Sequence, residues 1–260
     1  MVILNNKARA RKTMRYSTVI FFFLIINGKL LLAAPPTELL ACGDSLYEAY
    51  QYGESAKFYR QAAVADSQSF DAFWKLGRSL NYLGELTPRD SQLAVFEEAR
   101  DAEKLALTKR DISADAHFQM ARAVGKIALF KGIFSSIGLA KQVKAEAERT
   151  LALDSLHDGA WHILGRWHRE VGKKPKLFRI PLGLGEANKK DAISFMQKAV
   201  ILNPTLINHR LEMGITYLEY GMKTEARAEF GQCLSLPGHG PVDDKYKEEA
   251  KKYLAGMDKK

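Results

Sequence analysis

The segment Phe73-Trp-Lys-Leu-Gly-Arg-Ser-Leu-Asn-Tyr-Leu-Gly84 places apolar residues at the spacing of an amphipathic helix, with a small residue, Gly77, near its centre. Small residues recur in this setting along the chain, at Gly43, Gly77, Ala121, Gly165 and Gly214. A second series of small residues consists of Ala62, Ala106, Thr150, Ala199 and Cys233. Four times, a member of the second series precedes the next member of the first by 15 residues. This regularity indicates an internal repeat.

Each repeat predicts two antiparallel helices that cross closely at the small residues. The segment from Ala192 to Pro204 fits a second helix, and Pro204 ends it because proline cannot continue the backbone hydrogen bonds. Residues Val242 to Leu254 are rich in Lys and Glu, as is typical of the polar end of a repeat array. We therefore expect residues 35–260 to form an all-α solenoid of about five helix pairs with a C-terminal capping helix.

Segments 73–84 and 192–204 resemble the first and second helices of the tetratricopeptide repeat family, and the resemblance covers about residues 38–236. The chain departs from the strict repeat length of that family. The interval between the small residue and the second helix pattern is 12 residues in repeats one and five, 22 in repeats two and three, and 27 in repeat four. We expect this extra length to project as hairpins from one edge of the solenoid.

The second half is also similar to the regulator of microtubule dynamics family, a divergent tetratricopeptide group. The resemblance is carried, in order, by Leu164 to Val171, Ala192 to Pro204, Gly214 to Gly221, Leu236-Pro237 and Asp243 to Ala250. It implies a helical binding scaffold. It also implies a microtubule-associated role in the cytosol of a eukaryote, as an alternative to the export that the amino terminus suggests.

Residues 1–34 have the composition of a targeting segment, with six basic residues and no acidic one. A basic stretch from Lys7 to Arg15 precedes an apolar run, and this order is typical of a signal peptide. An uncleaved membrane anchor and a lipoprotein modified at Cys42 are the alternatives; otherwise Cys42 is a small buried helix residue. We expect an extracytoplasmic protein, periplasmic or secreted, that contacts a membrane only through this segment if it is retained.

The composition of the rest of the chain excludes several classes of protein. The formal net charge of the 260 residues is +9, but beyond residue 34 there are 33 basic and 30 acidic residues, which gives little support for nucleic-acid binding. Two cysteines cannot form a disulfide framework. Motifs for a nucleophile, a phosphate loop or a metal are missing from the sequence, so we expect no enzymatic activity, no cofactor and no metal.

The candidate binding residues follow from the repeat register. The residue after the first small position is Arg78, Arg122 and Arg166 in three consecutive repeats, each 44 residues apart. The tetratricopeptide resemblance places this position in the concave groove, where a ladder of guanidinium groups would bind carboxylates of an acidic protein or peptide. Neighbouring groove positions hold Trp74, Tyr82, Phe118 and His162.

Alternatively, each arginine pairs with an acidic residue of an adjacent repeat, for which Glu85, Glu98 and Glu170 are available. Taken together, the sequence predicts an exported, non-enzymatic scaffold that binds a partner segment in its groove. A membrane-anchored scaffold and a microtubule-associated protein are the alternatives.

The hairpin of repeat four, residues 172–185, combines four basic and five large apolar residues. It either contacts an anionic membrane or a partner, or folds its apolar residues back on the solenoid and leaves its lysines solvated. The hairpin of repeat three, with Ile133, Phe134 and Ile137, has the same two interpretations. If neither hairpin packs, the two form an exposed apolar patch of the kind that marks an interface.

Overall fold

The computed structural model describes residues 34–132 and 136–259. In these ranges the chain forms helices and connecting turns, with no strand. The helices are α2 (Pro36–Glu48), α3 (Tyr52–Ala65), α4 (Phe70–Leu86), α5 (Arg89–Lys109), α6 (Ala114–Lys131), α7 (Ile137–Leu153), α8 (Asp158–Gly172), α9 (Lys176–Arg179), the 3-10 turn η2 (Ile180–Leu182), α10 (Lys189–Leu202), α11 (Ile207–Glu219), α12 (Lys223–Ser235) and α13 (Pro241–Asp258).

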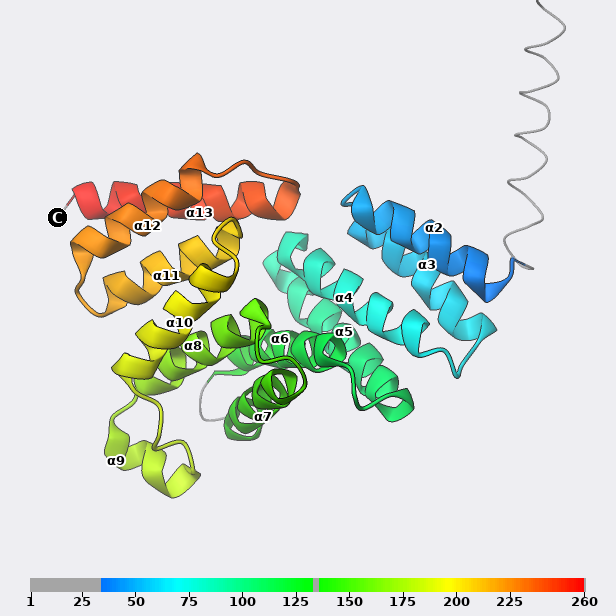
Figure 1. Cartoon of the computed structure of the whole chain (residues 1–260), viewed down its shortest axis with the longest axis horizontal. Coiled ribbons are helices and arrows are strands. Elements are labelled where there is room, and N and C mark those ends of the chain that lie inside the picture. Colours follow the sequence, from blue (N-terminus) through cyan, green and yellow to red (C-terminus); the bar gives the residue numbers. More distant parts are fainter. Residues whose placement is uncertain (1–33, 133–135, 260) are drawn as a thin grey trace, which may run out of the picture.

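Successive helices pair and stack into a curved solenoid (Figure 1). The five repeats are α2–α3, α4–α5, α6–α7, α8–α10 and α11–α12, and each pair packs against the next along the array. Helix α13 packs against α11 and α12 at the end of the array. The predicted all-α solenoid of five helix pairs with a C-terminal capping helix is confirmed.

The small residues lie where paired helices approach each other most closely. All five members of the second series are fully buried. In the first series, a methyl group at Gly165 would lie 2.9 Å from the backbone nitrogen of Met196, and one at Gly214 would lie 2.5 Å from the ring of Phe230. The small residues therefore mark the positions where paired helices cross, as the sequence predicts.

Side-chain caps fix several helix starts. The hydroxyl groups of Ser69 and Ser113 accept hydrogen bonds from backbone N–H groups in the first turns of α4 and α6. The side chain of Asn188 does the same for α10. Such caps satisfy backbone donors that have no partner within the helix, so they set where these three helices begin.

The extra length of the middle repeats is mostly helix, which differs from the expectation of projecting hairpins. In repeat two, α4 and α5 have 17 and 21 residues and are joined by only two residues, Thr87 and Pro88. Residues 89–109 contain no Gly or Pro that would end the helix. In repeat four the extra residues do form a hairpin, built from α9 and η2, that protrudes at the lower left of Figure 1.

The curvature brings the last helix back to the first repeats. The ammonium group of Lys245 in α13 reaches the backbone carbonyl of Glu85 at the end of α4. Gly240 packs on the ring of Tyr50, so closely that a methyl group there would lie 2.8 Å from it. Tyr52 belongs to the same apolar cluster as Val242 of α13. Helix α13 therefore closes one side of the concave groove as well as capping the array.

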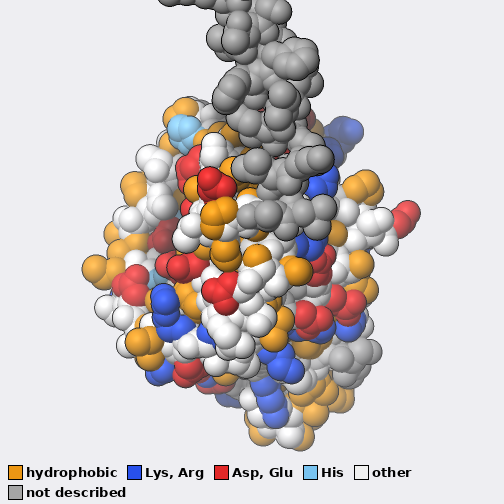
Figure 2. All heavy atoms as spheres, turned by 90° about the vertical axis from the view of Figure 1, so that its right-hand side faces the viewer, with side chains coloured by type: hydrophobic (Ala, Val, Ile, Leu, Met, Phe, Trp, Pro, Cys, Tyr) orange, Lys and Arg blue, Asp and Glu red, His pale blue; other side chains and the backbone are white. Residues whose placement is uncertain are grey.

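The surface carries both signs of charge. Figure 2 shows acidic and basic side chains interspersed over the visible face at the end of the molecule formed by the first repeats. Such mixing agrees with the small net charge beyond residue 34 and gives no broad basic surface on that face.

The predicted signal peptide or anchor, residues 1–34, lies outside the described residues except for Ala34. Within residues 34–132 and 136–259, none of the helices combines the length and apolar character needed to cross a bilayer. Cys42, the predicted lipidation alternative, is an exposed residue of α2, so its interpretation as a buried helix residue is wrong. Its side chain lies on the outer face of the first helix because Leu39 and Gly43 take the buried positions of α2.

Candidate binding groove

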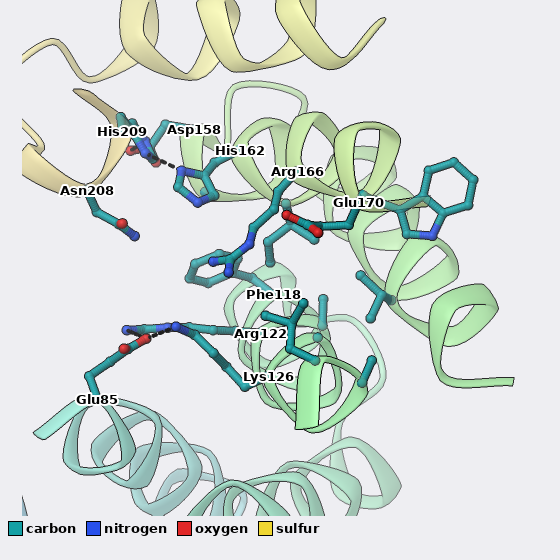
Figure 3. Close-up of a pocket in the computed structure, with 18 of the residues that line it drawn as sticks. Glu85, Phe118, Arg122, Lys126, Asp158, His162, Arg166, Glu170, Asn208 and His209 are labelled. Carbon is teal, nitrogen blue, oxygen red and sulfur yellow. Dashed lines mark hydrogen bonds and ion pairs between the residues drawn. The ribbon is translucent and has the colours of Figure 1, made fainter. Parts of the chain in front are cut away.

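The concave side of the solenoid encloses a cavity of about 810 Å³. The inner helices α4, α6 and α8 form its floor, the start of α13 closes one side, and the hairpin of repeat four forms part of the rim. Both charged and apolar side chains line it. The charged and polar ones include Glu85, Arg122, Lys126, Asp158, His162, Arg166, Glu170, Asn208 and His209 (Figure 3).

The first charged cluster surrounds Glu85. The side chain of Glu85 is 4% exposed, Lys126 of α6 forms an ion pair with it, and Arg122 lies 3.9 Å away. Burial would raise the pKa of Glu85, but the charges of Lys126 and Arg122 outweigh burial and lower it to about 2. The carboxylate is therefore ionised in the cavity wall and is held by cations that are more exposed than it is.

The second cluster joins α8 to α11. Glu212 accepts from Arg166 at 2.9 Å and from Arg169 at 2.6 Å. Burial would raise the pKa of Glu212, but the two guanidinium groups hold it well below its ordinary value. Arg169 also donates to the backbone carbonyl of Glu212 and to the hydroxyl of Thr216, so it is locked within the helix interface. Arg166 is the member of this cluster that lines the cavity.

Two buried histidines connect the same helices. The Nδ1 atoms of His162 and His209 are 2.8 Å apart, and Nε2 of His209 lies 3.0 Å from Oδ2 of Asp158 (Figure 3). Because the carboxylate can only accept, a neutral His209 donates from Nε2 and accepts at Nδ1 from His162. Burial, followed by the neighbouring His209, keeps the pKa of His162 well below its ordinary value. A neutral His162 then presents Nε2 as a hydrogen-bond acceptor at the cavity wall.

The other half of the cavity is mainly apolar. Apolar side chains predominate in the wall formed by the second halves of α6 and α8, the start of α7 and the inner residues of the hairpin, although Glu170, Lys174 and Arg179 also line it. Its apolar side chains are Leu129, Val143, Ile163, Val171, Leu182 and Leu184. The cavity is thus amphipathic, with the cluster of Glu85, Arg122 and Lys126 toward α4 and mostly hydrocarbon toward α9.

Five of the seven predicted groove residues line this cavity, namely Tyr82, Phe118, Arg122, His162 and Arg166. Tyr82 stacks on Tyr52, and the ring of Phe118 lies over His157. Arg122 also lies 4.2 Å from the centre of the Tyr82 ring, a cation–π contact between repeats. The interpretation that the arginines pair with acids of neighbouring repeats also agrees with the geometry of Arg122 and Arg166. Their role in binding stays a prediction.

Trp74 and Arg78 are not among the residues that line the cavity, so the structure does not bring Arg78 together with Arg122 and Arg166 there. The guanidinium group of Arg78 lies 3.8 Å from the centre of the Tyr47 ring and 4.7 Å from that of Trp74. The indole N–H of Trp74 donates to Asp71 in its own helix. These contacts occur because repeat one covers the groove side of α4 at this point and supplies Tyr47 as a packing partner.

The sequence pattern does not indicate Lys126, Asp158, Asn208 or His209 as cavity residues, although all four line the cavity. Lys126 had a usable signal, because it follows Arg122 by four residues and so lies one turn further on the same helix face. Asp158, Asn208 and His209 have no such signal in the sequence. They lie at the first residues of α8 and α11, and whether these residues reach the cavity depends on how repeats four and five pack. Among the described residues, no three His, Cys, Asp or Glu side chains are grouped to hold a metal ion.

The fold and the groove define a protein of the tetratricopeptide repeat class. A TPR protein of Thermus thermophilus superposes with a TM-score of 0.63 at 16% identity, over 85% of this chain and 99% of that one. PilF of Pseudomonas aeruginosa superposes with a TM-score of 0.53 at 13% identity, over 86% of each chain. At these identities the likeness establishes the fold alone.

The chain belongs to the family described as Regulator of microtubule dynamics protein 1-3, whose model matches residues 39–258. It is 26% identical to Regulator of microtubule dynamics protein 1 of Mus musculus, over 85% of this chain and 74% of that protein. It is also 26% identical to Regulator of microtubule dynamics protein 3 of Bos taurus, over 81% of this chain and 47% of that protein. The predicted family resemblance is confirmed.

The predicted extracytoplasmic location, periplasmic or secreted, is wrong. The mouse and bovine relatives are named as regulators of microtubule dynamics, and microtubules assemble in the cytosol. The physical reason for the error is that a basic stretch followed by an apolar run is shared by export signals and by other amino-terminal segments. The pattern therefore does not report on which side of a membrane the folded domain lies.

Proposed function

We propose that the chain is a non-enzymatic protein-binding scaffold that holds a segment of a partner protein in its concave groove. One observation carries the proposal: side chains from the inner helices of three consecutive repeats converge on one cavity of about 810 Å³. A groove lined by aromatic rings and arginines, such as Phe118, Arg122 and Arg166, has the composition of a binding hot spot.

The exposures of the charged groups favour an acidic partner segment. The carboxylates bound to the groove cations, Glu85 and Glu212, are 4% and 8% exposed, whereas Arg122, Lys126 and Arg166 are 12%, 20% and 25% exposed. An incoming segment therefore meets these three cations before the carboxylates that they bind. The other carboxylates of the cavity wall, Glu170 and Asp158, are 25% and 27% exposed and are paired with Arg169 and His209. Guanidinium groups bind carboxylates through paired hydrogen bonds, which favours Asp or Glu side chains in the segment.

A binding screen against acidic peptides tests this proposal, with the full chain and fluorescence anisotropy as the readout. Arg122→Glu should weaken the tightest peptide by about tenfold or more, because it replaces an attractive charge with a repulsive one. Arg122→Gln, which does not place a second carboxylate beside Glu85, should weaken binding in the same direction. Arg227→Glu is the matched control, since Arg227 is half exposed and lies on the outer helix α12. Unchanged affinity in both Arg122 variants would contradict a role of the groove in binding the partner segment.

The family assignment favours a microtubule-related partner, because both relatives carry that role in their names. Cosedimentation of the full chain with assembled microtubules tests it. Binding that weakens with Arg122→Gln but not with Arg227→Glu would link this role to the groove. A chain that stays in the supernatant at every protein concentration would contradict the role.

A second candidate function is supported by the apolar half of the cavity. Its volume lies within the range of small-molecule sites, and its walls pass from cations near Arg122 to hydrocarbon near Leu184. This arrangement fits an amphipathic ligand with an anionic group and an apolar chain. Mass spectrometry of the full chain, purified without detergent and then denatured, should release such a ligand from the wild type and less from Arg122→Gln. A wild-type protein that releases nothing would contradict this candidate.

A further inference from the structure

The hairpin of repeat four exposes three bulky apolar side chains within four positions. Leu177, Phe178 and Ile180 are 77%, 65% and 56% exposed. A single exposed apolar residue is ordinary, but a contiguous group on one protruding element marks a contact surface. Of the two interpretations from the sequence, packing back on the solenoid holds for Leu184, which together with Ala187 packs against Val143 and Trp167. Contact with a membrane or a partner stays a prediction for the three exposed residues.

The hairpin is a built structure rather than a loose loop. The buried guanidinium group of Arg179 donates to the backbone carbonyls of Lys174 at 2.7 Å, Leu184 at 3.2 Å and Ala187 at 2.7 Å. Gly183 turns the chain with a φ of +70°, a conformation that glycine adopts without strain. These contacts hold the two arms of the hairpin together and leave Leu177, Phe178 and Ile180 exposed to solvent.

The charged residues within the hairpin are all basic. Residues 171–185 contain four basic residues and no acidic one. Lys176 is exposed beside Leu177, and the side chain of Lys141 from α7 lies 3.4 Å from where a methyl group on Gly183 would be. Of the acids that flank the hairpin, Glu170 and Glu219 are bound to Lys173, and Glu186 lies 3.3 Å from Lys144 of α7.

The shape of the hairpin suits a flat partner. Figure 1 shows α9 protruding from the stack beyond the ends of α8 and α10. A convex tip offers no groove for a peptide, but it can reach a planar surface. Apolar side chains flanked by lysines are the composition by which peripheral proteins bind anionic bilayers, with hydrocarbon in the interfacial region and ammonium groups at the phosphates.

We propose that the α9 hairpin docks on the surface of an anionic phospholipid membrane, with Leu177, Phe178 and Ile180 entering the interfacial region. Phe178 also lines the cavity, but this surface contains none of the groove cations Arg122, Lys126 and Arg166. The proposal does not depend on the partner segment proposed above. A protein partner for the same tip is the competing outcome.

Site-specific fluorescence tests the docking directly in the full chain. In a Cys42→Ser background, Leu177→Cys carries an environment-sensitive dye; Cys233 is buried and stays unlabelled. Vesicles of one part phosphatidylserine and two parts phosphatidylcholine should shift the emission of this dye to the blue, and vesicles of phosphatidylcholine alone should not. Ile112→Cys is the matched control, because Ile112 is 73% exposed and lies in the turn between α5 and α6. No shift at position 177, or an equal shift at 112, would overturn the proposal.

Vesicle cosedimentation of the full chain gives an independent measure that keeps the amino-terminal segment constant. The triple variant Leu177→Ser, Phe178→Ser and Ile180→Ser should bind anionic vesicles about tenfold more weakly than the wild type. The matched triple variant of other exposed apolar residues, Ile112→Ser, Leu156→Ser and Ile201→Ser, should bind as the wild type does. Equal binding by both triple variants would overturn membrane docking. The exposed apolar residues of the hairpin would then be interpreted as a contact surface for a protein partner.

Discussion

At the scale of single residues, the crossing of α8 and α10 is set by Gly165, whose missing side chain makes room for the neighbouring backbone. A methyl group at Gly165 would lie 2.9 Å from the nitrogen of Met196 and 3.2 Å from the oxygen of Ala192. Backbone atoms of α10 cannot move aside as a flexible side chain can. A methyl group at Gly125, in the next inner helix, would meet only the side chain of Val143 at 3.7 Å.

We expect Gly165→Ala to destabilise the protein by about 2 kcal/mol, because α8 and α10 must separate. Gly125→Ala should be neutral or stabilising by up to about 1 kcal/mol, because alanine favours a helix and finds ordinary contact distances there. Urea unfolding of the two variants measures both values. Equal effects of the two substitutions would contradict the close crossing.

Glu103 is the residue that sequence reasoning would least expect in the core. It packs against Gly77, in the place that Tyr59, Met196 and Phe230 occupy in other repeats. Its side chain is fully buried, and neither carboxylate oxygen has a hydrogen-bond partner. Burial therefore raises the pKa of Glu103 well above its ordinary value, although Arg78 opposes the shift.

This raised pKa gives Glu103 a defined effect on stability. The folded chain holds the proton that the unfolded chain releases near pH 4.5, so stability falls as the pH rises above that value. Glu103→Gln removes the titration, and we expect it to be about 1 to 2 kcal/mol more stable than the wild type at pH 7. The difference should vanish below about pH 4. A pH series of thermal or urea unfolding measures it, and a difference that is constant with pH would contradict a buried, protonated carboxyl group.

At the scale of elements, helix α13 completes the burial of the last repeat. Cys233 of α12 is fully buried, and burial raises the pKa of its thiol to about 11. Val242, Tyr246 and Ala250 of α13 belong to the same apolar cluster as Cys233. The capping role was predictable from the sequence because Lys and Glu dominate one side of this segment.

We expect Ala250→Asp to release α13, because it places a charge at a fully buried position. The thiol of Cys233 should then react with a maleimide at least about tenfold faster, while Cys42, which is exposed, reacts at its original rate. Ala255→Asp changes an exposed residue of the same helix and should leave Cys233 protected. Mass spectrometry of the labelled peptides gives the rates, and rapid labelling of Cys233 in the unaltered chain would contradict the capping arrangement.

The elements also show where sequence reasoning reached its limit. The two series of small residues were sufficient to predict helix pairs, since a crossing constrains both helices at once. Loop lengths were less predictable: the spacing between patterns gives the number of residues but not whether they extend a helix, as in α5, or form a hairpin, as at α9. Only the second of these has the Gly and Pro residues that interrupt a helix.

At the scale of the whole molecule, the small rotation between successive repeats accumulates until α13 meets α4. A periodic sequence predicts that neighbours stack but does not fix the sum of the rotations, so the closed side of the cavity was not predictable. For the same reason the arginine ladder was predicted as three equal members. Repeat one packs Tyr47 against Arg78, whereas Arg122 and Arg166 line the cavity.

The central claim is that a partner segment occupies the cavity, and thiol protection tests it most directly. In a Cys42→Ser background, Asn208→Cys places a reactive group on the cavity wall, and Val64→Cys places one on the outer surface, where Val64 is 86% exposed. The probe is the acidic peptide that binds tightest in the anisotropy screen. The account predicts that saturating peptide slows maleimide modification of Cys at 208 by about tenfold and leaves modification at 64 unchanged. Equal modification of position 208 with and without bound peptide would contradict it.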